Sequence, residues 1–182
     1  MDEIITNAAL PGVRFTVWQD TSAEDPRNWI DDSHAQTLTY HAAHGYDTDG
    51  ADDAATGTMQ AFMRVYDETG NADLANRVAE RYARTFEPEA RVHVSRGRGY
   101  SQGEWWETVT VVTDAGYGTP EGHAEEFHQW MRGDVYGVTV ERLTVCDHGV
   151  EHWDAEDSLG GIYADSASSA VAYFREECAV SA

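Results

Sequence analysis

Hydrophobic and polar residues alternate near the start of the chain, from Val13 to Val17. A period of two is typical of a strand with one buried face, so we predict a first strand here. The residues that follow, 19–32, are mostly polar, and the pair Asp25-Pro26 favours a turn. This stretch is therefore predicted to be a loop.

Two helices are predicted next. Apolar residues recur at helical spacing from Asp52 onward, and Gly70 marks the expected end of the first helix. Asn71 has the right side chain to cap the second helix, which Pro88 ends. The predicted buried stripe of that second helix has one residue in every four: Leu74, Val78, Tyr82 and Phe86. We expect the two helices to form an antiparallel pair.

Strand patterns return at residues 91–94 and 108–113, joined by a glycine-rich connection, and predict a hairpin. Thr119 followed by Pro120 predicts the start of a third helix, which Gly133 closes. Residues 135–145 are rich in strand-forming side chains, and their predicted partner is the segment 158–163, across an acidic turn region. Asp165 is the expected cap of a last helix that buries Ala170, Val171, Phe174 and Cys178.

This order of elements indicates an α+β fold in which a largely antiparallel sheet packs with about four helices. Neither an internal repeat nor a linker interrupts the pattern. We therefore predict a single domain over residues 1–182, a length that buries a core without help from disulfides or metals.

Charge is the most unusual global property of the chain. It has 33 Asp and Glu against 12 basic residues, all of them Arg, which gives a formal charge of −21. Six Trp and nine Tyr are too many large rings for a disordered acidic tail, so the acidity lies on a folded body. Adaptation to a salty cell explains the same composition without any partner.

The first ten residues lack the basic start and apolar run of a signal peptide, and no apolar stretch is long enough to cross a bilayer. We expect a cytoplasmic protein. Cys146 and Cys178 match no zinc or redox spacing, so reduced thiols are expected. Neither cysteine, nor Ser101 or Ser158, has the sequence context of a nucleophile.

A metal-dependent enzyme or metal-binding protein is the alternative that the residues leave open. Imidazole and carboxylate groups at close spacing ligate zinc or manganese. The candidate ligands are His41 and His44, followed by Asp47, Asp49, Asp52 and Asp53. A solvated acidic loop leading into a helix N-terminus accounts for the same residues. We predict no cofactor.

The segment 96–100 concentrates two Arg beside Tyr100, as in some nucleic-acid contacts. The charge of −21 opposes phosphate binding, so we predict no direct contact with nucleic acid. The glycine-rich segment 96–103 also lacks the Gly-Lys-Ser/Thr ending of a phosphate-binding loop.

Carboxylates on a rigid surface can instead occupy a positively charged groove that evolved for phosphates, so that the protein imitates DNA. Three acidic clusters are the candidate partner-binding residues. They are Glu24, Asp25, Asp31 and Asp32; Asp47, Asp49, Asp52 and Asp53; and Asp147, Glu151, Asp154, Glu156 and Asp157. For any one cluster, a solvated loop is the competing interpretation.

Several short motifs occur together in this chain: residues 25–29 (Asp-Pro-Arg-Asn-Trp), 99–105 (Gly-Tyr-Ser-Gln-Gly-Glu-Trp), 132–137 (Arg-Gly-Asp-Val-Tyr-Gly) and 157–163 (Asp-Ser-Leu-Gly-Gly-Ile-Tyr). In combination they resemble a group of small proteins encoded by bacteriophages and other mobile elements. That group usually has a Cys-Trp or similar pair where this chain has Leu159-Gly160. The resemblance transfers no catalytic residue. It implies a phage accessory or counter-defence protein that acts on a host machine, with a basic nucleic-acid-handling or defence protein as partner.

Overall fold

The strands form two antiparallel four-stranded sheets, each with its own helices. The computed structural model describes residues 2–6, 10–28, 35–41, 45–47, 53–98, 105–112 and 118–178. The chain divides into two compact units, Met1–Glu24 with Gly133–Ala182, and Asp25–Arg132. The predicted α+β class is confirmed, with four α-helices among the described residues. The single domain over 1–182 stays a prediction, and each unit is described by itself.

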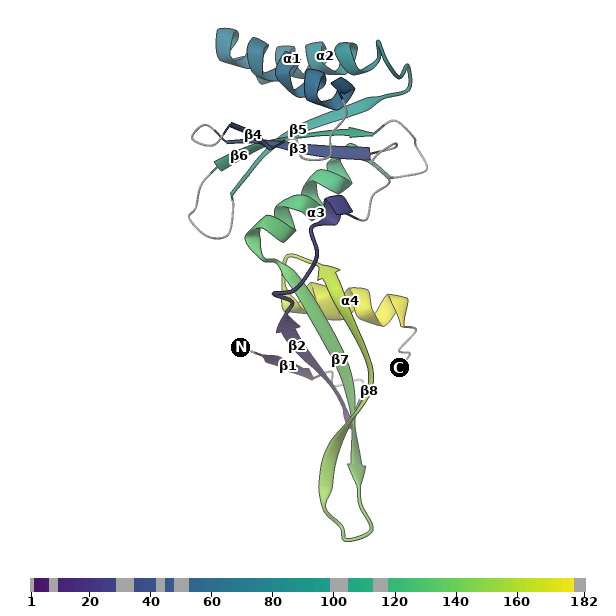
Figure 1. Cartoon of the computed structure of the whole chain (residues 1–182). Helices are drawn as coiled ribbons and strands as arrows, with labels where there is room; N and C mark the ends of the chain where they lie inside the picture. The colour runs from purple at the N-terminus through teal and green to yellow at the C-terminus, as the bar shows by residue number, and fades with distance from the viewer. Residues whose placement is uncertain are drawn as a thin grey trace. The chain divides into compact units, whose positions relative to one another are not determined.

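The first unit is a sheet with one helix on it (Figure 1). Its strands lie in the order β1-β2-β7-β8, so that β8 is at one edge. Their bounds are β1 Glu3–Thr6, β2 Val13–Gln19, β7 Val135–Val145 and β8 Glu151–Tyr163, and the helix is α4 Ala167–Glu177.

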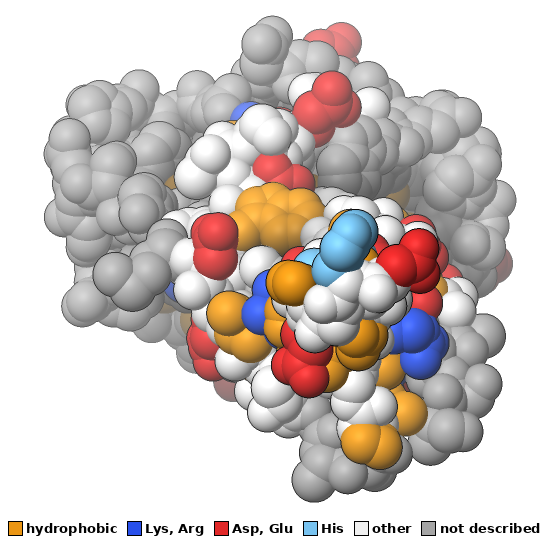
Figure 2. Space-filling view, turned by 90° about the horizontal axis from the view of Figure 1, so that it is seen from below, with side chains coloured by type: hydrophobic (Ala, Val, Ile, Leu, Met, Phe, Trp, Pro, Cys, Tyr) orange, Lys and Arg blue, Asp and Glu red, His pale blue; other side chains and the backbone are white. Residues whose placement is uncertain are grey.

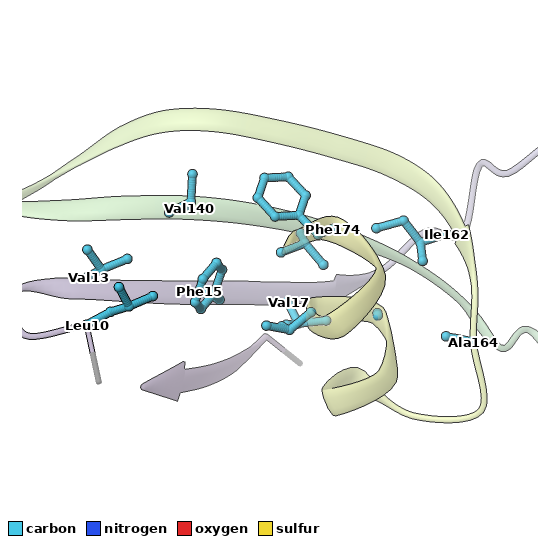
Figure 3. Close-up of a cluster of buried hydrophobic side chains, with 11 residues drawn as sticks. Leu10, Val13, Phe15, Val17, Val140, Ile162, Ala164 and Phe174 are labelled. Carbon is cyan, nitrogen blue, oxygen red and sulfur yellow. The ribbon is translucent and has the colours of Figure 1, made fainter. Parts of the chain in front are cut away.

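Alternation along β2 and β7 builds the core of this unit. Val13, Phe15 and Val17 lie on one face of the sheet, in a core cluster that also contains Ala170, Val171 and Phe174 of α4 (Figure 3). The Phe15 and Phe174 rings are fully buried and meet edge to face, with centroids 6.3 Å apart. Edge-to-face packing is the favoured geometry for aromatic rings, and burial of two such rings is a large share of the stability of a small core.

On the other face of the same sheet, Trp18 of β2 lies opposite Gly137 of β7. The Trp18 ring covers this glycine so closely that an added Cβ would lie 2.7 Å from the indole Nε1. Gly137 therefore provides the space into which the ring packs. The sequence motif around Gly137 thus has a structural reason.

The second unit places helices on both faces of its sheet (Figure 1). Strand order is β4-β3-β6-β5, with β3 Ala35–His41, β4 Gly45–Asp47, β5 Arg91–Arg98 and β6 Trp105–Val112. The helices are α1 Asp53–Thr69, α2 Ala72–Ala83 and α3 Pro120–Arg132, and a short 3-10 helix, η1, spans Pro26–Asn28.

The two faces of this second sheet differ in chemistry. Leu38, Val109 and Val111 form one core with α1 and α2. The residues that alternate with them are the buried threonines Thr37, Thr39, Thr108 and Thr110. Because α3 contacts β3, β5 and β6, it covers this hydroxyl-lined face. One side of the sheet is thus apolar, and the other combines the four threonines with the buried Ala35 and Val112.

Several helix boundaries are confirmed. Gly70 and Gly133 follow α1 and α3 and have the positive φ angles, 63° and 75°, that glycine adopts most easily. The Asn71 side chain accepts a hydrogen bond from the Leu74 amide, and Thr119 accepts one from the Gly122 amide. The strand at 135–145 is found as predicted.

The predicted buried stripe of α2 is wrong at Tyr82 and Phe86, whereas Leu74 and Val78 are half-buried. Ala75, Ala79 and Ala83 are the buried residues of this helix. Tyr82 and Phe86 are exposed, at 36% and 53%, and Phe86 lies beyond the helix end. Small alanine side chains face the neighbouring elements because they let the helix approach those elements closely. The larger side chains one position earlier would keep the helix further away.

Three other predictions need correction. The acidic region before residue 158 is not a turn, because β8 already begins at Glu151. The cap of α4 is Ser166, whose side chain accepts from the Ser169 amide, and not Asp165. The strands β1, β3 and β4 were not predicted. β1 and β4 are short, with four and three residues, whereas β3 has seven and includes the strand-forming run Thr37 to Tyr40, so its pattern was missed.

Candidate interaction surface

Acidity is denser in the first unit than in the second. The first unit has 14 Asp and Glu against 3 Arg over 74 residues, and the second has 19 against 9 over 108. Formal charges are therefore −11 and −10. The smaller unit thus has the larger negative charge per residue.

The third predicted cluster lies on the hairpin formed by β7 and β8. Its acidic residues, Asp147, Glu151, Asp154, Glu156 and Asp157, are all exposed. Four of them are spread along β8, at positions 151, 154, 156 and 157, and at about 3.3 Å per residue the row from Glu151 to Asp157 spans about 20 Å. A row of carboxylates on a strand is thus the arrangement that the structure gives to this cluster. Figure 2 looks onto the end of this hairpin, where acidic side chains are spread among hydrophobic and basic ones.

This hairpin extends beyond the rest of its sheet (Figure 1). The pairing of β2 with β7 ends at Val13 and Arg142, and one further bond joins the Leu143 amide to the Gly12 carbonyl. We call residues 143–153 the projecting hairpin. Its loop closes with a hydrogen bond from the Gly149 amide to the Cys146 carbonyl, and Gly149 has a φ of 76°. This is the geometry of a three-residue hairpin loop, which fixes the register of the strands.

Two of the acidic residues have close partners on the same face of the hairpin. Glu156 forms a two-pronged pair with Arg142. Asp154 accepts a hydrogen bond from the Thr144 hydroxyl at 2.7 Å and lies 3.2 Å from His152 Nε2. These exposed pairs contribute little to stability but hold the carboxylates in place. Among the described residues, no ion pair or side-chain hydrogen bond is found for the Asp147 and Glu151 carboxylates.

The opposite face of the hairpin has a different network. The Arg14 guanidinium donates to Glu141 at 2.9 Å and lies over the Trp153 ring, 4.5 Å from its centroid. Hydrogen bonds from Arg14 and Thr16 hold the pKa of Glu141 below its usual range. Glu141 is thus a structural carboxylate, fixed to the body of the sheet. Val145 and Val150 are exposed near the loop, at 62% and 61%.

The first predicted cluster is divided. Glu24 is exposed in the first unit, and the Tyr163 hydroxyl donates to its backbone carbonyl. Asp25 belongs to the second unit, where its carboxylate forms a 2.6 Å pair with Arg27. Asp31 and Asp32 lie outside the described residues. Asp25 is therefore engaged inside its own unit rather than offered to a partner.

The second predicted cluster and the proposed metal ligands are described only in part. Asp53 is exposed at the start of α1, while His41 and Asp47 are on the paired strands β3 and β4, two positions out of register. His44, Asp49 and Asp52 lie outside the described residues. Over the described part of the chain, no three His, Cys, Asp or Glu side chains come together as a metal site would require.

A buried polar network under α3 was not predicted. His128 Nε2 lies 2.9 Å from the Thr108 hydroxyl and 3.4 Å from that of Ser95. Burial lowers the pKa of His128. The Glu125 carboxylate acts in the opposite direction and raises this pKa, whereas Arg132 and His93 lower it further. Threonine alternates with Leu38, Val109 and Val111, a pattern typical of a strand with only one buried face, so the sequence did not indicate that the threonine face is buried as well.

The two cysteines do not bond to each other and are free. Burial raises the pKa of the Cys178 thiol, and the Asp157 carboxylate adds to this effect. A raised pKa disfavours the thiolate, which is the reactive form. Cys178 is therefore a poor nucleophile.

Comparison with protein-family models, with curated proteins and with solved structures gives no significant match. In the described residues, no helix has both the length and the apolar character needed to cross a bilayer.

Proposed function

We propose that this chain is an accessory protein without chemistry of its own that binds a basic, nucleic-acid-handling protein through its acidic surface. The observation that carries the proposal is the row of exposed carboxylates on the β7–β8 hairpin. The row stands on a paired strand, so its charges are held in a fixed order. A basic groove that accepts phosphates would accept them in the same way.

The density of charge in this row is about half that of one DNA strand. Each strand of a duplex carries one charge per about 3.4 Å of helix axis, or about six charges in 20 Å. β8 has four acidic residues between Glu151 and Asp157, and Asp147 adds a fifth in the loop. Arg142 neutralises one of them, Glu156. The hairpin therefore imitates part of one strand and not a whole duplex.

The biological setting of the proposal comes from the sequence motifs. Their resemblance to bacteriophage-encoded proteins implies a counter-defence role, in which the acidic surface inhibits a host protein in the host cytoplasm. A partner that binds DNA non-specifically fits this role, because its binding site already attracts negative charge. The metal-dependent alternative is not favoured by any contact among the described residues.

A pair of matched variants tests the proposal. The hairpin variant combines Asp147→Asn, Glu151→Gln, Asp154→Asn and Asp157→Asn. The control variant makes the same change of charge at exposed positions of the second unit, with Asp67→Asn, Glu68→Gln, Glu87→Gln and Glu89→Gln.

The experiment is a pull-down from host lysate at low and moderate salt, with and without competing duplex DNA. We expect one basic nucleic-acid-binding protein to be retained at low salt by the wild type and the control variant, and to be displaced by DNA. The hairpin variant should retain at most about a quarter as much, because four surface charge pairs at about 0.2–1 kcal/mol each sum to about 0.8–4 kcal/mol. Equal retention by both variants would show that the hairpin carboxylates are not the binding surface. Folding that requires molar salt would instead favour adaptation to a salty cell.

A further inference from the structure

β8 is the edge strand of the first unit's sheet and is exposed over much of its length. The sheet order places it beside β7 only, and in the described part of the chain no strand pairs with its other side. Most residues from Glu151 to Ser158 are exposed, Trp153 being half-buried. An edge strand presents a row of backbone N–H and C=O groups that pair readily with a further strand.

The hydrogen bonds of the hairpin identify which backbone groups face outward. The Cys146 amide donates to the Val150 carbonyl at 3.0 Å, and in an antiparallel pair the bonded positions alternate. Cys146 and Val150 therefore form a hydrogen-bonded pair, and the next pair in the register, Val145 and Glu151, is one in which the two backbones do not bond to each other. Glu151, Trp153 and Ala155 therefore direct their N–H and C=O groups away from β7. Beyond Ala155 the register shifts, so the regular free edge is the segment 151–155.

Charge lies on both faces of the sheet along this free edge. Side chains alternate along a strand, which puts Glu151 on the Trp153 face and Asp154 on the other. A basic side chain of an added strand would therefore meet a carboxylate on either face. A second copy of β8 would bring like charges together, which is unfavourable across paired strands. The occupant that fits is an extended segment rich in Arg or Lys.

We infer that segment 151–155 of β8 binds an extended basic segment of the partner as an added strand. The inference rests on the proposed function, because it specifies how the same hairpin meets its partner. Main-chain hydrogen bonds to Glu151, Trp153 and Ala155 would give affinity, as in other cases of strand addition. The carboxylates would select the basic sequence.

Amide hydrogen exchange, measured by NMR on the full chain, tests this arrangement. The probe is a synthetic ten-residue peptide of alternating Arg and Val, and the controls are the same peptide N-methylated at every backbone amide and a peptide of alternating Ser and Val. At saturating Arg-Val peptide, exchange of the Glu151, Trp153 and Ala155 amides should slow at least about tenfold. The His152 and Asp154 amides already face β7 and should change little.

The N-methylated peptide keeps its charge but has no backbone donors, so we expect it to bind at least about tenfold more weakly. If it binds as well as the parent peptide, or if the three outward amides are not protected, the added strand is wrong while charge-dependent binding by the hairpin still stands. Equal protection by the Ser-Val peptide would overturn the preference for basic segments. The proposed function fails separately, if the hairpin variant retains the captured partner as well as the wild type does.

Discussion

Replacement of Gly137 by Ala tests how closely the Trp18 ring packs on the first unit's sheet. Gly137 lies opposite Trp18 in the β2–β7 pairing, and an added Cβ would lie 2.7 Å from the indole Nε1 and closer still to two ring carbons. Neighbouring atoms in a packed protein are normally about 3.5–4.0 Å apart. Since the backbone of both strands is held by their pairing, the Trp18 ring has to move.

The size and sign of the effect follow from two opposing contributions. A glycine in a strand interior is less favourable than alanine by about 0.5–1 kcal/mol, and overpacking costs about 1–3 kcal/mol. In the wild type, Gly137→Ala should therefore lower the free energy of unfolding by up to about 2.5 kcal/mol. In a Trp18→Thr background the clash is absent, and the same substitution should raise it by about 0.5–1 kcal/mol.

Urea unfolding followed by far-UV circular dichroism measures all four proteins of this double-mutant cycle, with a constant m value as the check on a two-state transition. The structure predicts a reversal of sign between the two backgrounds. If Gly137→Ala has the same effect in both, the contact between Trp18 and Gly137 is not what makes the position a glycine.

Other predictions concern the cores and the buried histidine. The pKa of His128 is lowered in the folded chain, so the unfolded chain binds this proton first, and stability should fall as pH decreases below about 6.5. His128→Gln should reduce the slope of unfolding free energy against pH in that range, whatever its effect at pH 7. Phe174→Ala should lower the free energy of unfolding by about 3–5 kcal/mol, because the ring is fully buried against Phe15. Ala79→Leu should cost about 1–3 kcal/mol in urea unfolding, since Ala79 and not Tyr82 faces the core. Ser166→Ala should lower the thermal midpoint through loss of about 1 kcal/mol of capping, and an unchanged midpoint would contradict that role.

Sequence reasoning worked best where a local signal has one structural meaning. The cap at Thr119, the proline after it and the glycine at 133 each act on the backbone of their own helix, and α3 begins and ends as they indicate. The strand at 135–145 was found because its branched side chains favour an extended chain.

Prediction failed where the outcome depends on distant partners. The stripe of α2 contains alanine because neighbouring elements approach it closely, and hydrophobicity alone selected the larger residues Tyr82 and Phe86. Asp154 and Glu156 looked like turn residues because strands rarely contain so many carboxylates. They lie on an edge strand, where charge is tolerated and discourages pairing between copies.

For the candidate surface, composition indicated acidity but not its placement. The sequence grouped Glu24 with Asp25, yet the boundary between the two units falls between them and Asp25 pairs with Arg27. The residues of the third cluster share one hairpin because β7 and β8 pair over most of their length. Such pairing is set by the register of the two strands and by the loop at Gly149, which the charge pattern does not reveal.

The most direct test of the central claim is the dissociation constant of the captured partner, measured against ionic strength for the wild type, the hairpin variant and the control variant. Surface charges are screened over about 8 Å at physiological ionic strength, so affinity that depends on them weakens as salt rises. We predict that the wild type and the control variant lose affinity steeply with salt, and that the hairpin variant binds weakly with a shallow dependence. A dissociation constant that is unaffected by salt, or a hairpin variant with the same salt dependence as the control, would contradict binding through the hairpin carboxylates.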